Sequence, residues 1–255
     1  MNARMSRRDV LLFTCLASSL TPFMGASVNV ALPAIGQEFH TSTVSLGWVA
    51  TAFLLATATG LVPIGRLANL RGRRKVFAAG LAVYSAGSLL CGLAPSLLAL
   101  VLFRVVQGIG GAMVFGTSTA ILTTTVTPSE RGMALGWNVA SVYAGLALGP
   151  FLGGILTENL GWRSLFFASL PVTLLILVLA TRRLREEPVE VEGERFDWVG
   201  ATFYGVVTGR VDGWIHFPAC TVERLPTRGR SRWARGVCPL AALDNEPACD
   251  PGSLP

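Results

Sequence analysis

Residues 65–75 read GRLANLRGRRK and adjoin two apolar stretches, residues 44–65 and 76–93. Five of these eleven residues are Lys or Arg. An α-helix needs about 20 mainly apolar residues to cross the hydrocarbon core of a bilayer, and both stretches come close to that length. Cytoplasmic loops of membrane proteins carry an excess of Lys and Arg. The basic stretch therefore predicts two membrane-spanning helices joined by a cytoplasmic loop.

Four further apolar stretches surround this pair, at residues 10–33, 97–122, 133–156 and 165–180. The composition agrees with a lipid environment, because 51% of the residues are hydrophobic and only 14% are charged, whereas soluble proteins carry about 25% charged residues. Lipid offers the backbone no hydrogen-bond partner, so each stretch is expected to be helical. The sequence therefore predicts an all-α membrane protein with about six transmembrane helices.

The Lys and Arg residues fall in alternate connections between these stretches. One set of connections is basic and comprises the N-terminus, residues 65–75, the connection with Arg131 and the segment after residue 181. The intervening connections contain Glu38 and His40, then the uncharged residues 94–96, then Glu158 and Arg163. This alternation predicts a multi-pass protein of the plasma or inner membrane with a cytoplasmic N-terminus. The same loops account for the net charge of +6, so the lipid bilayer and not nucleic acid is the expected partner.

Motifs for enzymatic chemistry do not appear in the sequence. The five cysteines are scattered and form no CxxC pair, which argues against a metal site. A nucleotide-binding loop and a nucleophile–base set are also missing. We therefore expect neither a cofactor nor an enzymatic reaction.

The composition changes after the sixth apolar stretch. Residues 1–181 are expected to form the six-helix membrane domain, and residues 182–195 a charged cytoplasmic linker. Residues 196–211 begin like a seventh helix, but Arg210 interrupts the apolar run. Residues 212–255 are rich in Arg, Pro, Gly and Cys and show no periodicity, which predicts disorder. This abrupt change inside an incipient helix leads to the hypothesis of a frameshifted or truncated gene product.

The basic stretch carries a glycine pattern as well as a charge pattern. Gly65 and Gly72 permit a tight reversal between two helices, and Arg73 and Arg74 follow the second glycine. The stretch resembles the cytoplasmic signature of the major facilitator superfamily, and this resemblance implies a loop that stabilises one conformational state. The acidic residue of that signature is replaced here by Asn69. The alternative interpretation is a basic loop that only fixes the orientation in the membrane.

The fourth apolar stretch contains a charged residue, Arg104, within RVVQGIGGA at residues 104–112. A charge inside a span is costly and requires a partner or a wet cavity. The segment resembles the fourth-helix signature of the same superfamily, which implies that Arg104 takes part in proton transfer or lines a central cavity. Asn29, Gln107 and Asn138 are the other polar candidates for the substrate and proton pathway. The alternatives are that Arg104 reaches the membrane interface and that the polar residues join helices.

The fifth apolar stretch contains GLALGPFLGG at residues 145–154, where Gly145, Gly149 and Gly153 recur every fourth residue. These glycines would form one groove along a helix, and residues 132, 136, 140 and 144 a second row of small residues. Pro150 lacks the backbone N–H and is expected to kink the helix. The stretch, which ends with Gly154, resembles the antiporter signature of exporters and so implies a hinge or seal during alternating access. Ordinary helix packing is the alternative.

Shorter matches indicate one branch of the superfamily. VNVALP at residues 28–33, GWR at residues 161–163 and FDW at residues 196–198 resemble the fourteen-helix drug-resistance branch. The whole resemblance covers residues 8–205. It implies one six-helix half of the family fold, built from two inverted three-helix repeats beside a cavity at the midplane. It also implies export of small amphipathic substrates driven by protons.

One departure from the family pattern concerns the proton. Many members of this branch carry an acid in the first span, where this sequence has Met24, and no Asp or Glu lies inside the six apolar stretches. A proton carrier must titrate near neutral pH, which Arg and Gln do not. Three functions are therefore considered: proton-coupled efflux, a membrane fragment that inserts without transporting, and import of a metabolite. A homodimer would supply two halves, and nothing in the sequence demonstrates one.

Overall fold

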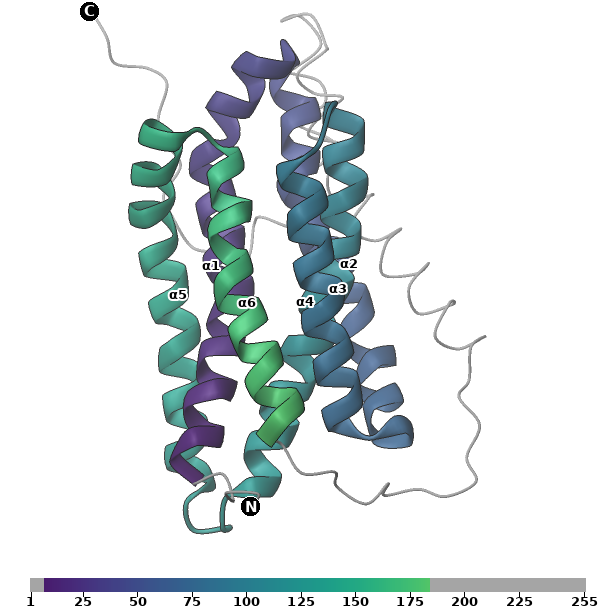
Figure 1. Ribbon diagram of the computed structural model, residues 1–255, viewed down its shortest axis with the longest axis vertical. Coiled ribbons are helices and arrows are strands. Elements are labelled where there is room, and N and C mark those ends of the chain that lie inside the picture. Colours follow the sequence, from purple (N-terminus) through teal and green to yellow (C-terminus); the bar gives the residue numbers. More distant parts are fainter. Residues whose placement is uncertain (1–6, 184–255) are drawn as a thin grey trace, which may run out of the picture. The chain divides into compact units, whose positions relative to one another are not determined.

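The computed structural model describes residues 7–183, which form six α-helices (Figure 1). They are α1 (Arg7–Phe39), α2 (Thr43–Arg71), α3 (Arg73–Gly92), α4 (Leu97–Thr125), α5 (Arg131–Leu160) and α6 (Arg163–Arg183). Each helix is long and apolar enough to cross a membrane. The predicted all-α fold with six spans is therefore confirmed for the described residues. The predicted linker, incipient seventh helix and tail lie outside them, apart from residues 182 and 183, which end α6.

The helices are longer than the apolar stretches that predicted them. α1 ends at Phe39 and not near residue 33, and α2 continues through basic residues to Arg71. Apolar composition marks only the part of a helix that lies in hydrocarbon. The backbone hydrogen bonds that make a helix can continue beyond that layer, since they do not depend on the solvent around the side chains. Charged residues near the bilayer surface therefore belong to helix ends and not to long loops.

The loop predicted over residues 65–75 is wrong in extent, because only Gly72 separates α2 from α3. Gly72 has a φ of +92°, a backbone conformation that favours glycine. Gly65 lies inside α2, where an added Cβ would meet no atom within 4 Å. Of the two glycines that were expected to permit the reversal, Gly72 makes the turn.

Two of the three connections at the other end of the helices end in a serine that caps the next helix. The hydroxyl oxygen of Ser42 accepts a hydrogen bond from the backbone N–H of Ser45 at 3.4 Å, and that of Ser96 accepts one from Ala99 at 3.3 Å. Such N-caps satisfy donors that the first turn of a helix leaves unpaired. Gly161 links α5 to α6 with a φ of +80°. The three connections at this end are therefore short and locally defined.

The first three helices interleave with the last three. α1 packs mainly on α5, α2 and α3 pack on α4, and α3 also packs on α6. Figure 1 shows the six helices running side by side, with α5 next to α1. Among them lies a buried apolar cluster that includes Met24, Val49, Cys91 and Leu100. Close packing of this kind holds helices together in lipid, where water does not drive their association.

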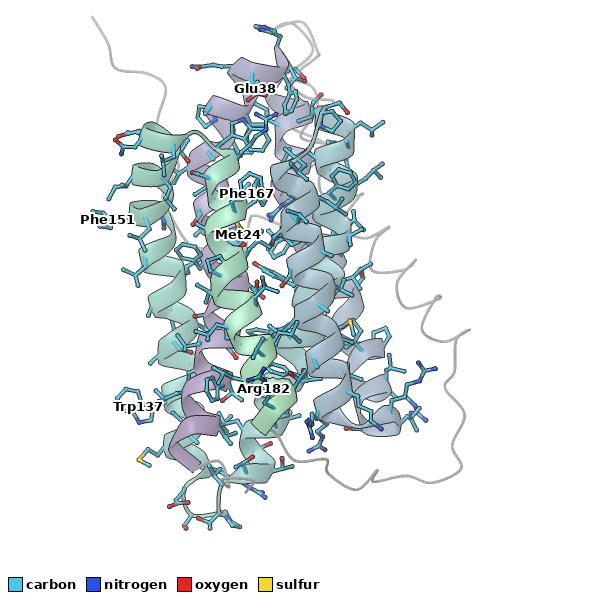
Figure 2. The ribbon with its side chains drawn as sticks, viewed as in Figure 1. Met24, Glu38, Trp137, Phe151, Phe167 and Arg182 are labelled. Carbon is cyan, nitrogen blue, oxygen red and sulfur yellow. The ribbon has the colours of Figure 1, made fainter. Side chains whose placement is uncertain are left out.

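Large apolar side chains also cover the outside of the helices. Trp137 and Phe151 project outward from α5 in Figure 2, and their exposed fractions are 59% and 66%. Exposed apolar surface of this extent marks a membrane or protein interaction surface. The outer face of α5 therefore fits contact with lipid or with other helices.

Candidate functional site

The charged residue of the fourth span, Arg104, is completely buried. It lies two turns from the start of α4, and its exposed fraction is 0%. Its Nε donates a hydrogen bond to the carbonyl oxygen of Val49 on α2 at 3.1 Å. The guanidinium carbon also lies 4.1 Å from the centre of the Phe53 ring, within the range of a cation–π interaction. The alternative in which Arg104 extends to the membrane interface is therefore wrong.

Gln107 extends the contacts of Arg104 to a third helix. Arg104 Nη1 donates to Gln107 Oε1 at 2.6 Å, and Gln107 Nε2 donates to the Ser88 hydroxyl of α3 at 2.7 Å. α3 approaches closely here because of Gly87, where an added Cβ would lie 2.7 Å from the Cα of Gln107. We call Val49, Phe53, Ser88, Arg104 and Gln107 the Arg104 network. It joins α2, α3 and α4 inside the bundle.

One nitrogen of the buried guanidinium is left over. Arg104 Nη2 has no hydrogen-bond partner. Within the part of the chain that the structure describes, the contacts of Arg104 are a carbonyl, an amide and an aromatic ring, and none is a carboxylate. A buried charge is costly unless it is paired or faces a wet cavity. The guanidinium can therefore donate one more hydrogen bond, and a negatively charged acceptor would fit best.

The other two pathway candidates lie elsewhere. Asn29 is exposed on α1. Asn138 of α5 is buried and donates to the Thr119 hydroxyl of α4 at 3.4 Å, while its Oδ1 has no partner. Thr119 follows Arg104 by fifteen residues on α4, or about 22 Å along the axis. The structure therefore brings Arg104 and Gln107 together, places Asn138 apart from them along α4, and leaves Asn29 exposed on α1.

The glycine row of α5 lies directly against α1. An added Cβ at Gly145 would be 2.5 Å from the carbonyl oxygen of Ser19, and one at Gly149 2.7 Å from the Cβ of Ala26. At Gly153 it would be 2.9 Å from the Cα of Ser27. The three glycines therefore let the two backbones approach, as small residues do between transmembrane helices. The Ser27 hydroxyl donates to the carbonyl oxygen of Gly149 at 2.9 Å, which adds a polar contact between α1 and α5.

The other residues of the antiporter-like stretch and the second predicted row are packed less closely. Gly154 is near only Val30, and α5 continues as a helix through the exposed Pro150. In the second predicted row, an added Cβ at Gly136 would meet no atom within 4 Å. Only the first row is therefore a packing face within the described helices.

Two hydrogen bonds donated by the basic turn differ in kind. Arg73 Nε donates to the Asn69 Oδ1 at 3.3 Å, so the residue in the place of the family acid still accepts a hydrogen bond from the turn. Arg74 Nη2 donates to the carbonyl oxygen of Thr181 at 2.5 Å, close to the end of α6. The last carbonyls of a helix lack partners within it and carry partial negative charge. Arg74 therefore ties the α2–α3 turn to the C-terminal end of α6.

A group of residues at the opposite end was missed by the sequence analysis as a unit. Glu38 of α1 and Arg163 of α6 form an ion pair, and Trp162 joins it through its indole N–H. The sequence signal was GWR at residues 161–163, which was noted as a family match. Nothing in the sequence paired it with an acid 125 residues earlier.

Comparison with known proteins agrees with these features. A model of the Major Facilitator Superfamily matches residues 14–230, which extends beyond residue 205, where the resemblance was expected to end. The chain is 36% identical to the "Multidrug resistance protein Stp" of Mycobacterium tuberculosis, over 80% of this chain and 40% of that protein. It is 35% identical to the "Tetracenomycin C resistance and export protein" of Streptomyces glaucescens, over 79% of this chain and 38% of that protein.

A less similar relative is named for the transport of a vitamin and not for drug resistance. The "Riboflavin transporter RibZ" of Clostridioides difficile is 27% identical over 78% of this chain and 44% of that protein. In each of these comparisons the chain spans less than half the length of the relative, or about 40% for the two drug-resistance proteins.

Proposed function

The chain belongs to the major facilitator superfamily, and from this premise we propose that its described helices are the amino-terminal half of a transporter that exports small amphipathic compounds. Proteins of this family are transporters and not enzymes. In the family fold, substrate binds near the bilayer midplane between two halves, and one half rocks against the other. The proposal therefore assigns α1 to α6 to one wall of that cavity.

The seating of the α5 glycine row on α1 is the observation that carries the export proposal. Gly145, Gly149 and Gly153 occupy the positions of the antiporter-like signature, and a Cβ added at any of them would come within 3 Å of an atom of α1. Such close packing can seal α1 and α5 against each other while one half of the transporter rocks against the other. The name of one relative, the "Tetracenomycin C resistance and export protein", supports the same direction of transport.

The distribution of charge supports a cytoplasmic N-terminus. The α2–α3 turn, the start of α5 and the end of α6 lie at one end of the helices and carry Arg73, Arg74, Arg131 and Arg182. Glu38 lies at the other end, as Figure 2 shows for Glu38 and Arg182. Because basic residues favour the cytoplasmic side, we assign the end with Arg182 to the cytoplasm.

Few acidic groups in the described part of the chain could take part in the proposed proton coupling. The acidic residues of the described segment are Asp9, Glu38, Glu130 and Glu158, and all four lie at or next to helix ends. Met24, in the place of the branch acid, is fully buried and apolar. We therefore assign the coupling carboxylate, and the counter-charge of Arg104, to groups outside residues 7–183.

A second candidate function is a membrane-inserted chain that does not transport by itself. The observation in its favour is that the six described helices form one half-sized unit with an unpaired buried cation. Transport of a metabolite is a third candidate, and the relative named as a riboflavin transporter is the observation that favours it.

Dye efflux in a strain without its own drug exporters separates these functions. The whole chain would be expressed in such bacteria, membrane insertion confirmed, and accumulation of a fluorescent cationic dye measured with and without a protonophore. Proton-coupled export predicts less dye in expressing cells and a return to the control level with the protonophore. The variant Gly149→Ala should weaken export, whereas Gly136→Ala, on the same helix, should not. Unchanged accumulation despite confirmed insertion would refute transport by this chain.

A further inference from the structure

Three connections at one end of the helices converge on the guanidinium of Arg163. Its Nη1 lies 2.6 Å from each carboxylate oxygen of Glu38, and its Nη2 donates to the carbonyl oxygen of Ala94 at 3.2 Å. The Trp162 indole N–H donates to Glu38 at 2.7 Å, and the guanidinium carbon lies 4.4 Å from the centre of the Trp162 ring. We call Glu38, Ala94, Trp162 and Arg163 the clasp.

Burial distinguishes the clasp from an isolated surface ion pair. The side chains of Glu38 and Arg163 are 42% and 37% exposed, and an exposed pair alone contributes little to stability. Trp162 and Ala94, in contrast, are 3% and 1% exposed. Trp162 also packs against Phe39 of α1, with ring centroids 5.9 Å apart. The buried partners hold the charged groups in one geometry, which reduces the entropy cost of pairing long side chains.

The turn that presents the clasp is also fixed. Gly161 has a φ of +80°, and the backbone N–H groups of Ser164 and Leu165 donate to the carbonyls of Gly161 and Trp162 at 3.1 and 3.3 Å. This local structure sets the direction in which Trp162 and Arg163 leave the end of α5. The clasp therefore does not depend on a chance conformation of two surface side chains.

The location of the clasp indicates its role. Glu38 lies in the last turn of α1, Ala94 lies between α3 and α4, and Arg163 begins α6, so one guanidinium contacts the α1–α2, α3–α4 and α5–α6 connections at this end of the helices. Arg74 ties the α2–α3 turn to α6 at the opposite end. We infer that the clasp fixes these three connections and so ties the first three-helix repeat to the second, with the result that the six helices move as one body between the two access states. The motion rests on the proposed function, whereas the fixed connections do not.

Labelling of a buried position beside the clasp tests the fixed connections directly. The full chain would carry Ala94→Cys, be purified in detergent micelles and react with a water-soluble maleimide. The labelling rate of the chain without Ala94→Cys is measured in the same way and subtracted from that of the variant. The carbonyl that Arg163 binds belongs to the backbone, so the substitution leaves the contact intact. With the clasp closed, the introduced thiol is expected to react slowly because position 94 is buried.

Loss of the clasp should expose that thiol. In Glu38→Gln and Arg163→Met the labelling rate is expected to rise about tenfold, the effect of losing roughly one charge-assisted hydrogen bond on a local opening equilibrium. Arg163→Lys should give an intermediate rate, because an ammonium can pair with Glu38 but does not reach two acceptors in the geometry of a guanidinium. Glu158→Gln removes an exposed carboxylate near the end of α5 and should leave the rate unchanged.

The outcomes separate the clasp from a general loss of folding. Circular dichroism and gel filtration would verify that each variant folds. If Arg163→Met does not fold, the test rests on Glu38→Gln, because the amide oxygen of the introduced Gln can still accept the hydrogen bond from Trp162. An unchanged labelling rate in Glu38→Gln would overturn the inference. An equal increase in Glu158→Gln would overturn it as well, because the clasp would then not be the cause.

Efflux kinetics test the consequence for transport. The clasp variants should lower the maximal rate of dye efflux with little change in the dye concentration at half-maximal rate, because the clasp lies at the helix ends and the proposed substrate site near the midplane. An unmodified chain that moves no dye would refute the proposed function, while the labelling rates would still decide whether the clasp holds its connections.

Discussion

A methyl group added to α5 should have opposite effects at two glycines on different faces of that helix. At Gly149 the new Cβ would lie 2.7 Å from the Cβ of Ala26 and 2.8 Å from the carbonyl oxygen of Phe23. Real Cβ atoms do not occupy such positions, so α1 and α5 would have to separate. At Gly136 the new Cβ would meet no atom within 4 Å. Gly136→Ala is therefore a matched control with the same chemical change on the same helix.

The magnitude follows from two opposing terms. Ala in place of Gly within a helix stabilises it by about 0.8–1 kcal/mol, and this gain applies at both positions. Overpacking of a tight contact costs about 1–3 kcal/mol, and this loss applies at Gly149 only. The free energy of unfolding of Gly149→Ala should therefore lie about 1–3 kcal/mol below that of Gly136→Ala.

Unfolding in mixed micelles measures this difference. The purified chain would be titrated with SDS while the helical circular dichroism signal is recorded, and the unfolding free energies of the two variants and the unmodified chain compared. Gly132→Ala, another open position on α5, serves as a second control. Equal free energies for Gly149→Ala and Gly136→Ala would refute the packing of α5 on α1 through the glycine row.

Three further predictions use the same unfolding measurement. Arg104→Lys should be less stable than Arg104→Met, because the ammonium stays buried without the two-directional contacts of the guanidinium whereas Met removes the charge; the reverse order would show that the charge itself is satisfied. Gly110→Ala should be about 1–3 kcal/mol less stable than Gly65→Ala, because a Cβ at Gly110 would clash with the backbone nitrogen of Tyr84, whereas one at Gly65 would meet no atom within 4 Å. Gly72→Ala should cost about 1–2 kcal/mol because of its positive φ, and a neutral effect would place the α2–α3 reversal elsewhere.

Hydrophobicity predicted the six spans well, because lipid selects apolar side chains wherever it touches a helix. It could not predict the helix ends, since the headgroup region accepts charged side chains on a continuing helix. α2 illustrates this limit, as it runs through Arg66 and Asn69 to Arg71. The turn at Gly72 could be expected from the sequence as one of two glycines, and only the backbone geometry distinguishes it from Gly65.

The candidate site was predictable where its residues lie on one helix. Gln107 follows Arg104 by three residues, so the two share a face of α4, and the four-residue spacing of the α5 glycines predicted a continuous groove. The periodicity of one helix does not identify its partner, so α1 as the surface beneath those glycines could not be derived. For the same reason, the contact of Ser88 with Gln107 could not be derived from the sequence. The pairing of Glu38 with Arg163 was hardest to derive, because the two residues lie 125 residues apart.

The unpaired nitrogen of Arg104 indicates that the described helices lack a group that the proposed transport would need. Packing inside the six-helix unit is tight around this residue, because Val49, Phe53 and Gln107 already occupy three sides of the guanidinium. The electrostatics are not satisfied to the same degree, since Nη2 is buried without a partner and Met24 offers no charge from α1. A cation in this position lowers the free energy of any anionic group that reaches it, in proportion to how far water is excluded. Arg104 thus has no counter-charge among its described contacts, which is the reason to propose one outside residues 7–183.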